Sequence, residues 1–323
     1  MNSKKIISIV LIVLLCGTIV KDFIVKNIIT SVGSKIVGAK IEMGGFSLGL
    51  LTQKVRMTRL KLYNPPGFPN EPMVDLPEVR VDFDTIAFLQ GKLHARLVVF
   101  NMKEMVVVRN KEGKLNVDSL KIIEDQKAAV EAKKKEKTSE PEKQMGLSID
   151  VLKLNVERVI LKDYTKGEPP AISAFEVALK DKEFKDITSA QQMITLVMFQ
   201  AMAPTAIQSA AMYAAATVLG VGFLPAGIVG MIVAKDDSAV EFKHSFDKVY
   251  SAALKFLQEQ GEIKSEDKAS GMIKAKVKGA DITAKIDKQP NGKVKLDITA
   301  RQMMLPKPEI AGGILYQIQG KLK

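Results

Sequence analysis

The sequence predicts an α+β protein with an N-terminal membrane helix, an antiparallel β-sheet with one apolar face, an apolar helical hairpin and a small C-terminal α-β-β-β-α domain. Three observations support this fold class. Apolar and charged residues alternate one for one in several segments between residues 53 and 120, as in strands with one buried face. Two long uncharged runs, 6–20 and 187–234, indicate helices in a bilayer or in a core. After residue 240, the pattern is helix, three strands, helix.

These changes in pattern divide the 323 residues into four parts. We expect them at 1–25 (membrane anchor), 26–180 (sheet domain, with a charged insertion at 121–144), 187–234 (uncharged helical segment) and 240–323 (small α+β domain). A net charge of +12 suits anionic lipid headgroups, an acidic partner or nucleic acid. Because the lysines are spread along the strands and only 6% of residues are aromatic, we expect no nucleic-acid partner.

The start of the chain predicts a membrane anchor. Residues 6–20 are uncharged and follow two lysines. A bilayer span needs about 20 apolar residues, so this run spans only if Lys21 snorkels at the far interface. The pattern favours a retained signal anchor, and a cleaved signal peptide and lipidation at Cys16 stay open as alternatives. By the positive-inside rule, we expect a single-pass protein of the inner (cytoplasmic) membrane with its bulk in the periplasm.

A short amphipathic helix that ends near Ile36 leads to the sheet, whose first strand we expect at 39–46. The clearest later strand is 78–84, where apolar and charged residues alternate without interruption. In segment 54–63 the alternation slips by one residue at Arg59, which predicts a bulge. The strands are joined by short turn sequences, so we expect a meander of antiparallel neighbours. The apolar face of this sheet would carry Val55, Met57, Leu60, Leu62, Val79, Val81, Phe83, Leu93, Ala95, Leu97 and Val99.

Five segments occur in an order that resembles a known family. They are Asn64 to Phe68 after a strand, Leu76 to Phe83, Val107 to Asn110 at the end of a strand, Gly113 to Asp118 and, beyond the charged insertion, Val151 to Asp163. Together with the membrane segment, this order resembles the N-terminal module of the AsmA-like family of bacterial envelope proteins over roughly residues 28–179. The resemblance implies lipid binding or transport in envelope and outer-membrane biogenesis, with membrane phospholipid as partner. An envelope protein is a second candidate partner.

The charged insertion at 121–144 is rich in Lys, Glu and Ala and shows almost no apolar periodicity. Such a composition cannot bury enough apolar surface to offset its ordering entropy, which favours a solvated loop. The alternative is a basic patch that contacts anionic lipid headgroups. Its residues would be Lys133, Lys134 and Lys135.

The uncharged segment at 187–234 permits three interpretations. Pro204 divides it, and glycines and a further proline interrupt its second part. A membrane-inserted helical hairpin is slightly preferred over helices packed on the apolar face of the sheet. A single span is the least favoured interpretation, because it would place the C-terminal domain across the membrane from the sheet.

The C-terminal part predicts a compact α+β domain. His244 to Gln260 has the spacing of an amphipathic helix, three alternating strands follow at 272–277, 282–286 and 294–300, and a last helix runs from Pro308 to Leu322. From about residue 237 the chain is similar to a small uncharacterised bacterial lipoprotein domain, which brings no known chemistry. The segments that carry this similarity are Phe246 to Tyr250, Gly271 to Ala275 and Ile314 to Ile318.

The sequence offers no motif for catalysis. Its two histidines, His94 and His244, lie far apart without cysteine or carboxylate at metal-ligand spacing, and no phosphate-binding loop or nucleophile elbow is present. We therefore expect a protein that is not an enzyme, without catalytic residues, metal or cofactor. The sequence predicts a membrane-anchored envelope protein that binds or transfers lipid on an apolar sheet. The alternative is a structural or partner-binding protein whose sheet is filled by its own helices.

Overall fold

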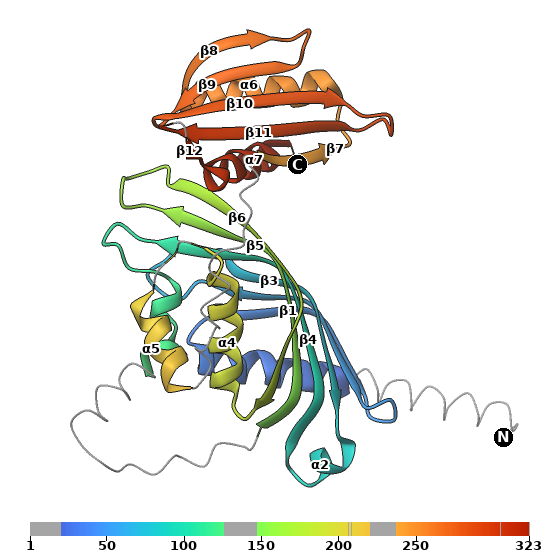
Figure 1. The fold of residues 1–323 in the computed structure, drawn as a ribbon. Coiled ribbons are helices and arrows are strands. Elements are labelled where there is room, and N and C mark those ends of the chain that lie inside the picture. Colours follow the sequence, from blue (N-terminus) through green and yellow to red (C-terminus); the bar gives the residue numbers. More distant parts are fainter. Residues whose placement is uncertain are drawn as a thin grey trace, which may run out of the picture. The chain divides into compact units, whose positions relative to one another are not determined.

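A computed structural model describes residues 21–125, 147–205, 207, 209–219, 237–303 and 305–322. It is an α+β protein with two six-stranded sheets and accompanying helices (Figure 1). Contacts divide the chain into two compact units, one formed by residues 1–157 and 177–224 and the other by 158–176 and 225–323. The second unit therefore includes a hairpin segment that the sequence assigned to the sheet domain, so the boundary expected at residue 180 differs from this division.

The first sheet has its strands in sequence order. They are β1 (Ile41–Gly49), β2 (Lys54–Tyr63), β3 (Pro72–Phe83), β4 (Leu93–Arg109), β5 (Leu147–Asp163) and β6 (Ala171–Ile187). Strands β1 to β4 pair antiparallel with their neighbours, as the predicted meander requires. Gly67 and Gly91 have φ values of 90° and 77° in the turns after β2 and before β4, a conformation that glycine adopts at no steric cost. A short helix, α2 (Thr85–Leu89), joins β3 to β4.

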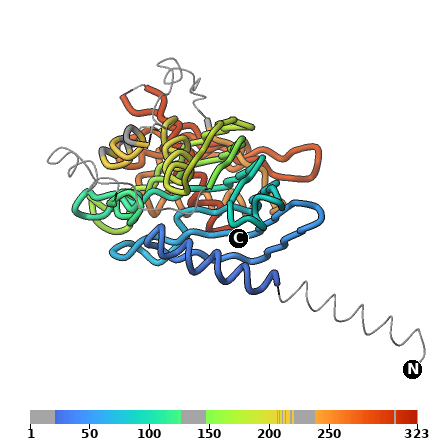
Figure 2. Tube along the Cα trace, turned by 90° about the horizontal axis from the view of Figure 1, so that it is seen from below, coloured from blue at the N-terminus to red at the C-terminus, as the bar shows by residue number. Residues whose placement is uncertain are grey.

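Both edges of this sheet are protected. The helix of residues 21–37 runs along β1 (Figure 1, Figure 2), and its side chains bond to backbone groups of that strand. The carboxylate of Asp22 accepts from the N–H of Leu48 (3.1 Å), and the hydroxyl of Ser34 accepts from the N–H of Ile41 (2.9 Å). At the other edge, β6 is rich in lysine and acidic side chains. Both devices discourage pairing with another chain.

Strand β2 contains a kink where the sequence predicts a bulge. The predicted bulge is wrong, because Thr58 pairs with Glu78 and Leu60 with Leu76 without a change of register. Instead, Arg59 between them has a left-handed φ of 51°, an uncommon conformation for a residue with a Cβ atom. The kink explains why the alternation slips although no residue is inserted.

The alternation of apolar positions differs on the two sides of the kink. A left-handed residue interrupts the regular alternation of an extended strand, so the side chains before and after it follow different alternations. In β2 the apolar positions are odd-numbered before the kink (Val55 and Met57) and even-numbered after it (Leu60 and Leu62). In β3 the residues paired with them change in the same way, from Val81 and Val79 to Leu76 and Val74.

Asparagine side chains form hydrogen bonds between β4, β5 and β6 at the same level of the sheet as the kink. Asn101 of β4, opposite Glu78, accepts a hydrogen bond from the side chain of Asn155 in β5 (3.0 Å). The Oδ1 atom of Asn155 accepts in turn from the backbone N–H of Asp181 in β6 (2.7 Å), which has a φ of 46°. Side-chain amides therefore provide partners where a strand departs from regular geometry.

Two segments that lie far apart in the sequence meet inside the first unit. The side chain of Asn116, which is fully buried, donates to Oδ1 of Asn64 (2.6 Å) and to the carbonyl of Val106 (2.9 Å). Its Oδ1 atom accepts from the N–H groups of Val108 (3.0 Å) and Val117 (2.9 Å). Asn116 therefore fastens the turn after β2 to the end of β4, which gives these asparagines a structural role.

The uncharged segment contains α4 (Ala190–Met202) and α5 (Ala210–Val218), which contact each other. All residues of α4 from Thr195 to Met202 are buried. These residues are therefore covered by other parts of the chain, and the helix has 13 residues. Among the described residues, no helix combines the length and apolar character needed to cross a membrane.

Several predicted features lie outside the described residues. These are the anchor up to residue 20 with Cys16, the greater part of the charged insertion with Lys133, Lys134 and Lys135, and residues 206, 208 and 220–234 of the uncharged segment.

The second sheet belongs to the C-terminal unit. Its strand order is β12-β11-β10-β9-β8, with β7 also paired to β11. The helices α6 (Phe246–Gln260) and α7 (Pro308–Leu322) contribute buried apolar residues to one core with the strands. The predicted helices and three strands are confirmed, whereas three further strands were not predicted. The strands are β7 (Asp237–Phe242), β8 (Gly261–Asp267), β9 (Met272–Val277), β10 (Ala280–Lys288), β11 (Val294–Gln302) and β12 (Leu305–Pro306).

Candidate functional site

Two rows of apolar side chains cross the first sheet from β1 to β4. Residues directly opposite each other in neighbouring strands share a face, so the register defines the rows. One row pairs Leu48 with Val55, Val55 with Val81 and Val81 with Val98; the other pairs Phe46 with Met57, Met57 with Val79 and Val79 with Phe100. We call this surface the apolar strip, formed by Phe46, Leu48, Val55, Met57, Val79, Val81, Val98 and Phe100.

The strip is only partly covered by the described chain. Leu48, Val79 and Val98 are buried, whereas the remaining five side chains are half-buried. Four of its members were predicted from the sequence: Val55, Met57, Val79 and Val81. The other four were missed because the sequence does not reveal the register between strands, and because residues 97–100 are apolar at every position.

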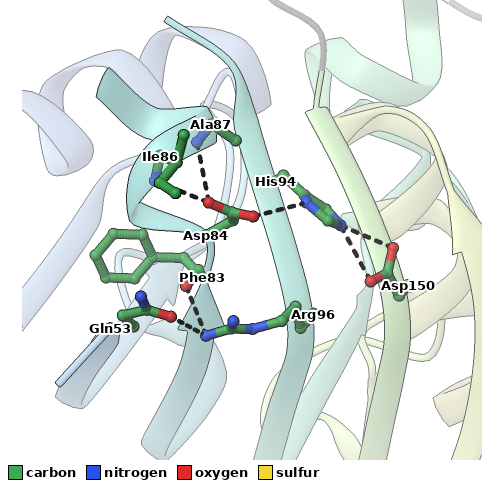
Figure 3. Close-up of polar contacts among 8 residues, drawn as sticks. All are labelled: Gln53, Phe83, Asp84, Ile86, Ala87, His94, Arg96 and Asp150. Carbon is green, nitrogen blue, oxygen red and sulfur yellow. Dashed lines mark hydrogen bonds and ion pairs between the residues drawn. The ribbon is translucent and has the colours of Figure 1, made fainter. Parts of the chain in front are cut away.

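A bulge in β4 places some of its side chains on a different face of the sheet from the one predicted. Phe83 pairs with Ala95, but the preceding residue, Asp82, pairs with Leu97, so Arg96 is an extra residue in β4. The guanidinium of Arg96 donates to the carbonyl of Phe83 (3.0 Å) and also bonds to Gln53 (Figure 3). The bulge shifts the alternation of β4 by one position.

Leu97 and Val99 consequently lie on the other face of the sheet from the strip. They pair with Asp82 and Arg80, whose neighbour Val81 belongs to the strip. The prediction that Leu97 and Val99 share one face with Val81 is therefore wrong, and the bulge is the physical reason.

The remaining predicted positions lie at the two ends of the strip. Phe83 and Ala95 are buried and continue it beyond Val81, where Phe88 of α2 packs edge-on against Phe83 with 5.9 Å between ring centroids. Leu93, at the start of β4, is 38% exposed. On the far side of the Arg59 kink, Leu60 is half-buried and pairs with Met43 and Leu76, while Leu62 is buried and pairs with Ile41 and Val74.

His94 forms a polar cluster that the sequence did not predict (Figure 3). Its Nε2 atom lies 2.9 and 3.0 Å from the carboxylate oxygens of Asp150, and its Nδ1 atom lies 4.0 Å from Asp84. Because a carboxylate only accepts, Nε2 carries a proton. Asp84 caps α2, and the N–H groups of Ala87 and Ile86 that donate to it lower the pKa of its carboxyl.

This cluster connects β4 to β5 and to the end of β3. Among the described residues, His94 has no hydroxyl or thiol as a hydrogen-bond partner. No group of three or more His, Cys, Asp or Glu side chains in the described ranges is arranged to hold a metal ion. The cluster is best explained as a structural connection between strands.

A basic hollow lies between the helix of residues 21–37 and strands β1 and β2. Its volume is about 400 Å³, and three cations, Lys26, Arg59 and Lys61, line it together with one carboxylate, Glu42. The side chain of Lys26 donates to the carbonyl of Gly44 (3.2 Å), which holds one cation at the rim. The sequence did not predict the hollow or that Arg59 lines it, because nothing in the sequence indicates that Lys26 lies beside β1.

Comparison with models of known protein families gave no match, and searches of curated proteins and of solved structures gave no significant match. The functional argument therefore depends on the site alone.

Proposed function

We propose that the protein is a membrane-anchored envelope protein that binds lipid acyl chains along the apolar strip of its first sheet. The observation that carries the proposal is the continuity of the strip, whose two rows cross four strands without a polar side chain. Its half-buried members give an acyl chain a surface to cover. The proposal places the bulk of the protein in the periplasm, with membrane phospholipid as the ligand and an envelope protein as a candidate second partner.

The size of the strip suits an acyl chain. Neighbouring strands lie about 4.8 Å apart, so four strands span about 14 Å, the length of roughly eleven methylene groups. Each methylene that leaves water contributes about 0.8 kcal/mol, so that five buried methylenes contribute about 4 kcal/mol. The basic hollow provides cations for a lipid phosphate at the same sheet.

A second candidate function is supported by the burial of α4. Because Thr195 to Met202 are all buried, this helix already fills part of the protein's interior. If the helices also fill the space over the strip, the protein is a structural or partner-binding element without lipid.

The test compares one polar substitution on each face of the sheet. We expect Val81→Asn to reduce the phospholipid that co-purifies with the full chain after gentle extraction, whereas Leu97→Asn, on the opposite face, leaves the amount unchanged. Native mass spectrometry measures the lipid, and circular dichroism shows that both variants are folded. A folded wild type without lipid would support the second candidate function. Equal lipid loss in both variants would show that lipid binding is not specific to the strip.

A further inference from the structure

We infer that one end of the first sheet inserts into the interfacial layer of a lipid bilayer. This surface, which we call the apolar tip, consists of Leu50 and Leu51 in the β1–β2 turn, Ile86 and Leu89 of α2, and Phe23 and Ile24 at the start of the helix of residues 21–37. The inference rests on the membrane anchoring in the proposed function, but not on lipid binding at the strip.

The tip exposes large apolar side chains to an unusual degree. Leu51 is 100% exposed, Leu89 78%, Ile86 68% and Phe23 65%. Single exposed apolar residues are ordinary on protein surfaces, but a group of them at one place indicates an interaction site.

Hydrogen bonds bring the three segments of the tip to the same end of the sheet. The hydroxyl of Thr85, which opens α2, donates to the carbonyl of Leu50 (3.1 Å). At the start of the helix, Asp22 accepts from the N–H of Leu48 (3.1 Å), and Lys21 bonds to the carbonyl of the same residue. The exposed side chains therefore belong to one surface held by the fold.

The charges around the tip suit a lipid interface. Residues 49–54 and 85–93 contain no acidic side chain, and their only charged residues are Lys54 and Lys92, both exposed. The acidic side chains beside the tip, Asp22 and Asp84, both accept hydrogen bonds from backbone N–H groups. Apolar side chains flanked by lysines are typical of segments that lie at the boundary between headgroups and acyl chains. The lysines would face the negative headgroups while the leucines and isoleucines enter the apolar layer.

The sequence that precedes the tip indicates that a bilayer covers it. Residues 6–20 are uncharged and lead directly to Lys21, which is bonded to the strand that ends at the tip. A bilayer that contains this run has its interface at Lys21, so the neighbouring tip meets the same interface. A second copy of the chain or another protein would cover the tip without requiring this placement.

A single tryptophan can report the environment of the tip, because the natural chain has none. We would compare Leu51→Trp and Ile86→Trp with Asn70→Trp, which is exposed in the turn at the opposite end of β2. Each full-length variant is reconstituted into vesicles of phosphatidylcholine and phosphatidylglycerol, with or without brominated acyl chains, and its flotation with the vesicles is measured.

We expect blue-shifted emission that brominated lipid quenches at positions 51 and 86, and red, unquenched emission at position 70. Unquenched emission at position 51 in protein that floats with the vesicles would refute insertion and leave anchoring intact. A blue shift without quenching would indicate that a protein partner covers the tip. Protein that fails to float would refute both anchoring and insertion. Lipid binding at the strip is measured separately with the Val81 variant, so its failure is distinguishable.

Discussion

At the scale of single residues, Asn116 makes the clearest contribution to stability. Its buried side chain holds two backbone N–H groups and one carbonyl and also bonds to Asn64. We expect Asn116→Ala to lower the free energy of unfolding by about 3 kcal/mol, since buried groups left without partners cost about 1–3 kcal/mol each, partly offset by relaxation. Urea denaturation followed by circular dichroism measures the loss.

Asn110 provides the control for this prediction. Its side chain accepts from the N–H of Lys114 (2.8 Å) in an exposed turn, so Asn110→Ala should cost less than about 1 kcal/mol. Similar losses in the two variants would show that the buried network contributes nothing beyond an ordinary turn.

At the scale of elements, the kink at Arg59 determines which side chains each strand presents. A β-branched residue tolerates the left-handed region poorly, whereas asparagine adopts it readily. We therefore expect Arg59→Val to destabilise the first sheet by about 1–2 kcal/mol more than Arg59→Asn, both of which remove the same charge. Thermal unfolding monitored by circular dichroism gives the difference, and equal stabilities would mean that the kink is not required.

The elements also show what the sequence could and could not predict. Uninterrupted alternation identified β9 with its bounds, and the apolar period and the proline identified α7 (Pro308–Leu322). In segment 147–163 the apolar alternation changes, which predicts two short strands at 147–151 and 154–161, but β5 (Leu147–Asp163) continues for 17 residues. The slipped alternation at Arg59 marks an irregularity in β2, but the sequence does not show whether it is a kink or a bulge, because that depends on the register with the partner strand.

The same limit applies to the candidate site. The apolar positions of β2 and β3 were visible as a pattern, so half of the strip could be predicted. The faces of Leu97 and Val99 could not, because the bulge at Arg96 is stabilised by contacts to Phe83 and Gln53 in other segments. The basic hollow likewise arises only when the helix of residues 21–37 lies along β1.

At the scale of the whole molecule, the C-terminal unit includes the end of the β5–β6 hairpin. A Cβ atom on Gly313 of α7 would lie 2.0 Å from the carbonyl oxygen of Ile172, so the helix approaches the strand more closely than other residues allow. We expect Gly313→Ala to lose about 1–3 kcal/mol through overpacking and to increase hydrogen exchange of residues 172–174.

Gly320 of the same helix is the matched control, since a Cβ atom there meets nothing within 4 Å. Gly320→Ala should leave the exchange of residues 172–174 unchanged and stabilise the helix by up to about 1 kcal/mol. Increased exchange in both variants would mean that the hairpin responds to the helix in general and not to the close contact at Gly313.

The central claim is that the apolar strip binds lipid, and site-specific photocrosslinking tests it most directly. The photoreactive residue benzoylphenylalanine would replace Met57 in the strip or, as a control, Arg80 on the opposite face, in the full chain within its native membranes. The account predicts a lipid adduct at position 57 and none at position 80, detected by mass spectrometry. Crosslinks from position 57 only to the protein's own helices, in folded protein, would contradict it.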